Sequence, residues 1–121
     1  MGKTISQWPI VYIILLNWNG WQDTIECLES LEKATYPNFN VVIIDNASAN
    51  DSVARIRAWI KERRIPLAEY KLESRKEQPV PINAEEPKKT GLRRVELISS
   101  AENLGFCAGN NVGMEFAHRA G

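Results

Sequence analysis

VVIIDNAS, residues 41–48, joins an uninterrupted apolar run to an aspartate that is followed by small and polar residues. Such a run of β-branched and aliphatic residues is typical of a strand covered on both faces, as in a parallel sheet. The polar residues follow the point where the strand ends, which is the edge where open α/β sheets bind ligands. The stretch therefore predicts an α/β fold with Asp45 at its binding edge.

The residues before this stretch complete a β-α-β unit. The apolar run 10–16 predicts a first strand, and residues 21–33 carry apolar side chains at helical spacing. Pro37 disfavours helix at the residue before it, so the helix is expected to end by that point. Residues 40–45 then form the second strand, and the crossover between the two strands is expected to be right-handed.

The residues after the stretch continue the alternation of helices and strands. A second helix is expected at 51–63, with Asp51 or Ser52 as its cap. A third strand is expected at 95–99 and a third helix at 108–118. The residues of the third helix expected to face the sheet are Val112, Phe116 and Met114. Together these elements predict a Rossmann-like three-layer α/β/α fold with a mainly parallel sheet.

Between the second helix and the third strand the apolar periodicity is lost. Residues 64–94 hold several prolines among many Lys, Arg and Glu residues. This composition favours a solvated chain over a packed core. We therefore expect a long, partly mobile, loop-like insertion within a single domain that spans residues 1–121.

The overall charge does not indicate a polyanionic partner. The chain has 121 residues, with 15 Lys plus Arg against 15 Asp plus Glu, so its formal net charge is zero and no nucleic-acid partner is expected. Cys27 and Cys107 lie far apart, without the spacing of a metal site, and are expected to be buried, reduced thiols. No apolar run reaches the ~18 residues of a membrane span, so we expect a cytoplasmic protein.

Asp45 is the main candidate for ligand recognition. A carboxylate at the end of a strand can accept hydrogen bonds from a ribose hydroxyl or from the imide N–H of uracil or thymine. Ser48 lies on the same loop. The alternative is that Asp45 and Ser48 only cap the loop and start the next helix, and the sequence leaves both interpretations open.

Two further segments could reach the same edge. Trp18 directly follows the first strand and could stack on a base or pack beneath the first helix. Asn103 to Gly105 precede the third helix, whose free N–H groups favour an anion or a sugar oxygen. Gly105, Gly109 and Gly113 could instead let that helix lie close to the sheet. Because they do not match G-x-G-x-x-G, a dinucleotide-binding oxidoreductase is disfavoured.

Five motifs follow one another along the chain. They are IILLNWNG (13–20), LESL (28–31), YP (36–37), VIIDNAS (42–48) with DS (51–52), and ENLGF (102–106) with GNNVG (109–113). In this order and spacing, the chain resembles the amino-terminal half of family 2 glycosyltransferases, the inverting enzymes with the GT-A fold. It resembles most the branch that contains rhamnosyltransferase-like enzymes of cell-surface polysaccharide synthesis.

The resemblance implies a partial GT-A fold, a nucleotide-sugar-binding domain that holds the nucleoside of a UDP- or dTDP-sugar. The acceptor would be a saccharide or a lipid-linked molecule. Trp18 would flank the base, and Asp45 would bond the base or the ribose. The nucleotide-binding residues would be Leu16, Asn17, Trp18, Asp45, Ser48, Asn103 and Gly105.

The chain departs from the family pattern at the catalytic chemistry. Family members carry a D-x-D motif that holds Mg²⁺ or Mn²⁺ against the diphosphate, and a later carboxylate that acts as general base. Here Asp23, Asp45 and Asp51 are the only aspartates, and none lie two apart. We therefore expect Mg²⁺ or Mn²⁺ in the full-length enzyme, but no metal, no catalytic residue and no sugar transfer in this chain alone.

These expectations describe a fragment of a longer transferase, which as a whole could associate with a membrane. The alternative is a non-catalytic α/β module that binds a nucleotide. In the resembling fold the first strand lies mid-sheet, next to a strand that this chain lacks. An unpaired apolar edge at 10–16 invites pairing with another chain, so a homodimer through this edge is expected.

Overall fold

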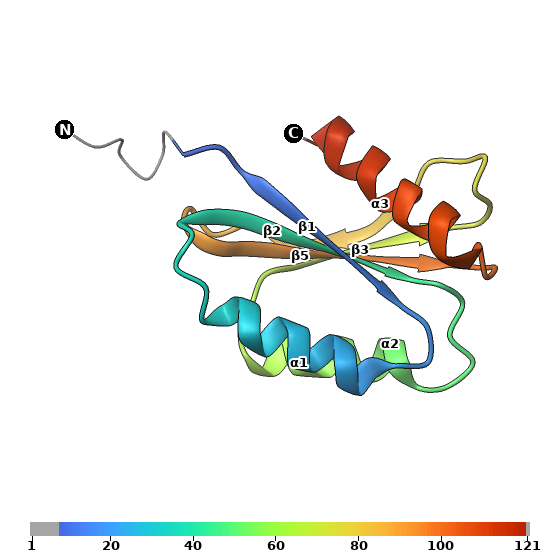
Figure 1. Ribbon diagram of the computed structural model, residues 1–121, viewed down its shortest axis with the longest axis horizontal. Coiled ribbons are helices and arrows are strands. Elements are labelled where there is room, and N and C mark those ends of the chain that lie inside the picture. Colours follow the sequence, from blue (N-terminus) through green and yellow to red (C-terminus); the bar gives the residue numbers. More distant parts are fainter. Residues whose placement is uncertain (1–7, 121) are drawn as a thin grey trace.

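The structure is a computed structural model that describes residues 8–120 (Figure 1). Its elements, in chain order, are β1 (Val11–Asn17), α1 (Trp21–Glu32), β2 (Asn38–Asp45), α2 (Ser52–Glu62), β3 (Leu67–Leu72), β4 (Val80–Ala84), β5 (Gly91–Ser100) and α3 (Gly105–Ala120). The three predicted helices and the three predicted strands are all present. The third helix and the third strand begin earlier than predicted, at Gly105 and Gly91.

The five strands form one sheet in the order β1-β2-β5-β3-β4. The four strands from β1 to β3 in this order are parallel, and only β4, paired with β3, runs antiparallel. α1 and α2 cover one face of the sheet, and α3 lies on the other (Figure 1). The predicted three-layer α/β/α fold with a mainly parallel sheet is confirmed.

Residues 64–94 do not form the expected long loop. They contain β3, β4 and the first residues of β5. β3 pairs with β5 on one side and β4 on the other, and its residues Leu67 and Leu72 are buried. The charged residues Glu69 and Lys71 alternate with less polar ones along β3. Because of this alternation, the short strand cannot be recognised from the polar composition of the region.

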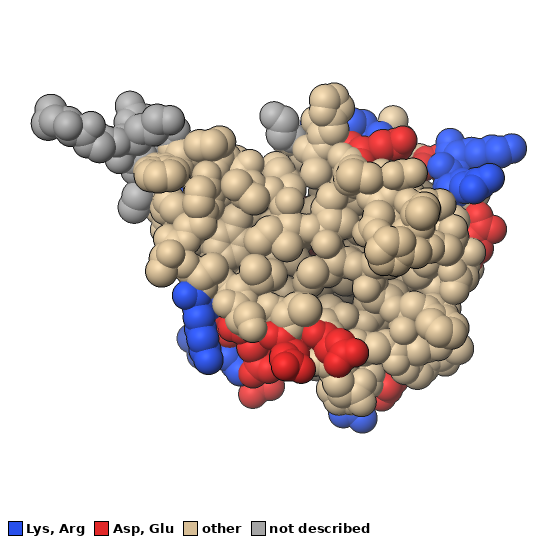
Figure 2. All heavy atoms as spheres, in the orientation of Figure 1, with Lys and Arg blue, Asp and Glu red and all other residues tan. Residues whose placement is uncertain are grey.

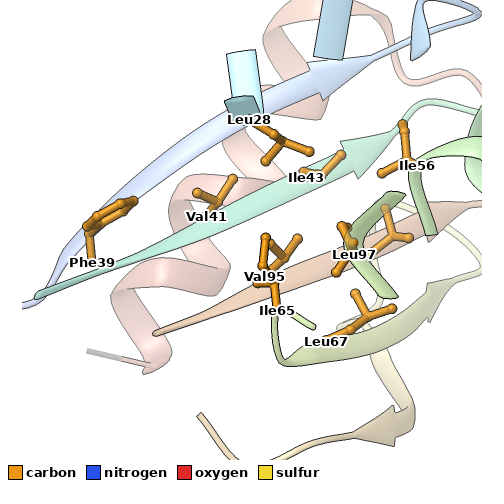
Figure 3. Close-up of a cluster of buried hydrophobic side chains, with 10 residues drawn as sticks. Leu28, Phe39, Val41, Ile43, Ile56, Ile65, Leu67, Val95 and Leu97 are labelled. Carbon is orange, nitrogen blue, oxygen red and sulfur yellow. The ribbon is translucent and has the colours of Figure 1, made fainter. Parts of the chain in front are cut away.

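The main core lies between the sheet and the helix pair α1 and α2. Figure 3 shows Leu28 of α1 and Ile56 of α2 against Ile43 of β2 and Leu97 of β5, and all four are fully buried. Burial of an aliphatic side chain of this size contributes about 1.5 to 3 kcal/mol. The helical spacing of the apolar residues in α1 and α2 therefore identifies the face that anchors both helices.

Two glycines let α3 lie close to the opposite face of the sheet. A Cβ atom at Gly113 would be 2.6 Å from Ile44 Cδ1 and 2.7 Å from Ile14 Cγ2, and one at Gly109 would be 2.6 Å from Leu16 Cδ1. These distances are shorter than any normal carbon contact. The interpretation that small residues bring this helix close to the sheet is confirmed.

The other side chains of α3 follow the predicted pattern in part. Val112 is buried, and Phe116 packs edge-on against Tyr70 of β3, with ring centroids 4.9 Å apart. The expectation for Met114 is wrong, because this side chain is exposed to solvent. Met114 lies away from the row formed by Gly109 and Gly113, which is the row that contacts the sheet.

Replacing Gly113 by alanine tests this close approach. Helix propensity alone would make Gly113→Ala stabilising by about 1 kcal/mol. We expect destabilisation by about 1 to 3 kcal/mol, because the new methyl group overlaps Ile14 Cγ2, which is bonded to Cβ and cannot swing away. Gly109→Ala should cost less, since its one contact shorter than 3 Å is with the flexible end of the Leu16 side chain. Urea unfolding of both variants measures the effect, and a rise in stability of Gly113→Ala would refute it.

A polar cluster lies on the α3 face of the sheet. Glu96 of β5 is only 2% exposed. Its Oε1 accepts a hydrogen bond from Arg94 Nε at 2.8 Å, and its Oε2 accepts one from Tyr70 Oη at 2.9 Å. Burial of the phenol and its hydrogen bond to Glu96 raise the pKa of Tyr70 from near 10 to about 12. Each carboxylate oxygen thus has a donor, as a buried charge requires.

The raised pKa of Tyr70 predicts a pH dependence of stability. The native state holds the phenol proton more tightly than the unfolded chain, so this stabilisation is complete below pH 10 and is lost as the pH rises through about 12. As the pH rises from 10 to about 12, the Tyr70→Phe variant should therefore lose less stability than the wild type. Urea unfolding at several pH values measures the difference. A Tyr70→Phe variant that loses stability as steeply as the wild type over this pH range would contradict the prediction.

The expectation of buried cysteines is wrong. Cys27 on α1 and Cys107 on the first turn of α3 are both exposed free thiols. The buried residues of α1 are Thr24 and Leu28, and those of α3 are Gly109, Val112 and Gly113, so neither cysteine lies on the buried face of its helix. Within residues 8–120, no helix is long and apolar enough to cross a bilayer.

Candidate functional site

The loops that follow β1, β2 and β5 meet at one edge of the sheet. The strand register sets Asn17, Asp45 and Ser99 side by side. Because parallel strands end at a common edge, the segments after them are neighbours there. The structure thus brings together the three polar segments that the sequence assigned to a single site.

Asp45 is held inside this edge by three hydrogen bonds. Its Oδ1 accepts from Asn17 Nδ2 at 2.9 Å and from Ser48 Oγ at 2.6 Å, and its Oδ2 accepts from the Ser48 main-chain N–H at 3.0 Å. Only 3% of Asp45 is exposed. These contacts correspond to the interpretation in which Asp45 and Ser48 fix the loop, and they add a link from that loop to β1.

Two other residues tie the first loop into the same network. Thr24 Oγ1 on α1 donates to Asn17 Oδ1 at 2.6 Å. Asn19 adopts a positive φ of 53°, which asparagine tolerates better than most residues. Its main-chain N–H donates to Ser48 Oγ at 2.9 Å, and its Oδ1 accepts from the Ala49 N–H at 2.8 Å. The β1 and β2 loops are therefore joined by side chains from both.

Asn46 joins the β2 loop to the start of α3. Its Oδ1 accepts from the Leu104 N–H at 2.7 Å, and its Nδ2 donates to the Gly105 carbonyl at 3.1 Å. Asn103 closes the same turn, since its Oδ1 accepts from the Gly105 N–H at 2.8 Å. Gly105 needs its positive φ of 79° at this turn. One buried amide thus holds the third loop in place through both of its polar atoms.

Three residues of this network, Thr24, Asn19 and Asn46, are not among the site residues predicted from the sequence. The available signal was that asparagine readily bonds to nearby main chain and accepts a left-handed conformation. Nothing in the sequence gives the partners of Asn46, because they lie 58 and 59 residues away along the chain. The predicted residues Asn17, Asp45 and Ser48 are central to the network.

Two large aromatic side chains are exposed at this edge, among polar residues such as Asn50 and Glu102. Trp18 is 59% exposed, so the alternative that its indole packs beneath the first helix is wrong. Phe106, on the first turn of α3, is 74% exposed. The first turn of a helix also carries main-chain N–H groups without intrahelical partners. The edge therefore offers aromatic faces and N–H donors to a ligand, above a buried polar framework.

A hollow of about 360 Å³ lies beside this edge, along the open side of β1. It is lined by Ile14, Leu15, Leu16, Asp23, Thr24, Cys27, Phe106 and Asn110. Leu16, which was predicted to contact a nucleotide, therefore faces this hollow. Asn17, Asp45 and Ser48 are not among its lining residues, because their side chains are turned toward one another.

Asp45 is the one carboxylate in the hydrogen-bonded network at this edge. Mg²⁺ and Mn²⁺ need several oxygen ligands. Asp45 already accepts three hydrogen bonds on its two oxygens. In the part of the chain that the structure describes, no three His, Cys, Asp or Glu side chains lie together in a way that could hold a metal ion.

Replacing Asp45 tests whether it supports the fold of this edge. Asp45→Asn keeps the shape but removes the charge and turns an acceptor into a donor against Asn17 or Ser48. We expect a loss of about 2 to 3 kcal/mol in the free energy of unfolding. Asp51→Asn is the matched control and should cost about 0.5 kcal/mol or less, because Asp51 is exposed and its carboxylate bonds only Arg55. Equal losses in urea unfolding would contradict the assignment.

The parallel sheet and the helices on both of its faces define a Rossmann-like α/β protein, with three joined loops at the carboxyl ends of β1, β2 and β5. Residues 12–80 match the family model described as glycosyl transferase family 2, and the chain belongs to this family. The matched region includes Asn17, Asp45 and Ser48 and ends before α3. No curated protein and no solved structure matches the chain.

Proposed function

We propose that this chain binds the nucleoside diphosphate part of a UDP- or dTDP-sugar at the edge formed by the loops after β1, β2 and β5. Family 2 glycosyltransferases act on a sugar donor and an acceptor, and the match to the family supports this substrate class. The proposal rests on the hydrogen bonds that join the three loops. Asn17 bonds Asp45, and Asn46 bonds both the Asn17 carbonyl and the Gly105 carbonyl. Loops that are fixed in this way are preorganised for a ligand.

The base would stack on Trp18. This indole is exposed beside the end of β1, and stacking does not depend on a particular hydrogen-bond pattern. A carboxylate has about four acceptor positions, of which Asp45 uses two on Oδ1 and one on Oδ2. We assign the remaining position on Oδ2 to the imide N–H of the base or to a ribose hydroxyl. In this arrangement the internal hydrogen bonds of Asp45 orient the oxygen that meets the ligand.

The diphosphate would lie toward the first turn of α3. Asn103 to Gly105 close that side of the edge, and the helix behind them is long enough to give a favourable dipole for an anion. Leu16 and Ser48 complete the proposed nucleotide contacts. The sugar and the acceptor, a saccharide or a lipid-linked molecule of the kind used by rhamnosyltransferase-like enzymes, would extend outward from this turn.

The proposal for this chain alone is binding without sugar transfer. The oxygens of Asp45 are engaged in the loop network, which supports a positioning role rather than metal binding or base catalysis. The same observation favours the second candidate, a non-catalytic nucleotide-binding module. In a longer enzyme, we propose that Mg²⁺ or Mn²⁺ is held by carboxylates outside residues 8–120. A radiolabelled-donor assay tests this proposal. Robust sugar transfer by this chain alone would refute it.

Calorimetric titration with UDP and with dTDP tests the binding site directly. Trp18→Ala should weaken binding by about 5- to 150-fold, which corresponds to the ~1 to 3 kcal/mol of one base–aromatic stack. Trp8→Ala is the matched control, because Trp8 is an exposed tryptophan at the opposite end of β1. It should leave the affinity unchanged. Binding of neither nucleotide by the wild-type chain, or equal losses in the two variants, would overturn the assignment.

A further inference from the structure

Each of the three loops at this edge turns through one residue with a left-handed backbone. These residues are Asn19 after β1, Ala47 after β2 and Gly105 before α3, with φ values of 53°, 58° and 79°. Glycine has no Cβ atom to clash in this conformation, and asparagine tolerates it better than most residues. Alanine has neither advantage, so Ala47 is the strained residue of the three.

Ala47 lies in the middle of the edge. β2 is the strand between β1 and β5, so the loop after β2 is the central one of the three. On one side of Ala47, Asn46 donates to the Gly105 carbonyl, and on the other side Ser48 accepts from the Asn19 N–H. The two neighbours of Ala47 are thus held toward opposite loops, whereas Ala47 itself is partly exposed. A ligand that spans from the loop after β1 to the loop after β5 therefore crosses Ala47.

The loops around Ala47 carry little charge. No Lys, Arg, Asp or Glu occurs in residues 17–22, 46–50 or 103–114. In Figure 2 the lower right of the molecule, where β1 and β2 lead into their loops in Figure 1, is formed mainly by uncharged residues. Recognition at this surface depends on stacking, apolar contacts and hydrogen bonds between neutral groups. A methyl group in such a surface suits the flat, uncharged part of a ligand, such as the base or the sugar ring of a nucleoside.

We propose that the Ala47 methyl group lies at the centre of the nucleotide site and contacts the nucleoside directly. This role rests on the proposed function and adds to it a residue whose side-chain size limits how closely the nucleoside approaches the loop. The backbone strain supports the role, because glycine would hold the same turn with less strain but would leave no side chain at this point.

Replacing Ala47 by glycine tests the contact, because its two expected effects have opposite signs. Glycine relieves the left-handed strain, and this gain exceeds the added entropy of glycine in the unfolded chain, so the urea midpoint should rise. The nucleoside loses its contact with one methyl group. Binding of UDP or dTDP should therefore weaken about fourfold in calorimetric titration, which is the effect of exposing one buried carbon group.

A second variant separates the side chain from the backbone. Ala47→Asn also relieves the strain, since asparagine adopts the left-handed conformation readily, but it places a larger side chain beneath the nucleoside. This variant should be at least as stable as the wild type and should bind either nucleotide about tenfold more weakly. If only the backbone conformation mattered, Ala47→Asn would bind as tightly as the wild type.

Arg64→Gly is the matched control. Arg64 is exposed, has a similar φ of 56° and lies between α2 and β3, at the opposite end of the sheet. The urea midpoint of this variant should rise as that of Ala47→Gly does, and its affinity for the nucleotides should equal that of the wild type.

The outcomes distinguish this role from the proposed function. If the wild-type chain binds a nucleotide and both variants of Ala47 bind it equally well, the role of Ala47 is refuted and the proposed function stands. If the wild-type chain binds neither nucleotide, both are refuted. A lower urea midpoint of Ala47→Gly, or an equal loss of affinity in Arg64→Gly, would also refute the role of Ala47.

Discussion

The hydrogen bond between the Asn17 amide and the Asp45 carboxylate holds together the edge at which the loops after β1, β2 and β5 meet. It is 2.9 Å long and joins the last residues of two adjacent parallel strands. Both side chains are buried, so loss of either partner would leave a polar group without water or a replacement. Thr24 adds α1 to this pair, and Ser48 adds the loop before α2. This contact and its neighbours therefore join two strands, a helix and a loop at one edge of the sheet.

The residues that build the edge are buried, whereas the side chains above them are exposed. Asn17, Asp45 and Asn46 use most of their hydrogen-bonding capacity within the protein. Exposed groups such as Trp18 and Phe106 lie above them. A site whose loops are already fixed loses less conformational entropy when a ligand binds. The asparagine, aspartate and serine of the motif are thus required by the fold of the edge, and a ligand is an additional reason for them.

The sequence predicted the layers, the parallel sheet and the meeting of three loops, because these follow from periodicity and from the strand ends. It missed β3, because Glu69 and Lys71 interrupt the apolar pattern of a strand in which Leu67, Ala68 and Leu72 are buried. It could not supply the partners of Asn46, since a side-chain contact between distant residues has no local signature. It also misplaced Cys27, because the burial tendency of a residue type does not identify the face of a helix on which it lies.

β1 and β2 have similar apolar sequences but different environments. Every residue of β2 is buried, whereas most of β1 is only partly buried and Val11 is exposed. An uninterrupted apolar strand is typical of a position with neighbours on both sides, and β1 has a neighbour on one side only. Helices on both faces of the sheet protect its side chains in part but cannot pair its main chain. The composition of β1 is therefore that of an interior strand, and this mismatch is resolved when another strand occupies its open edge.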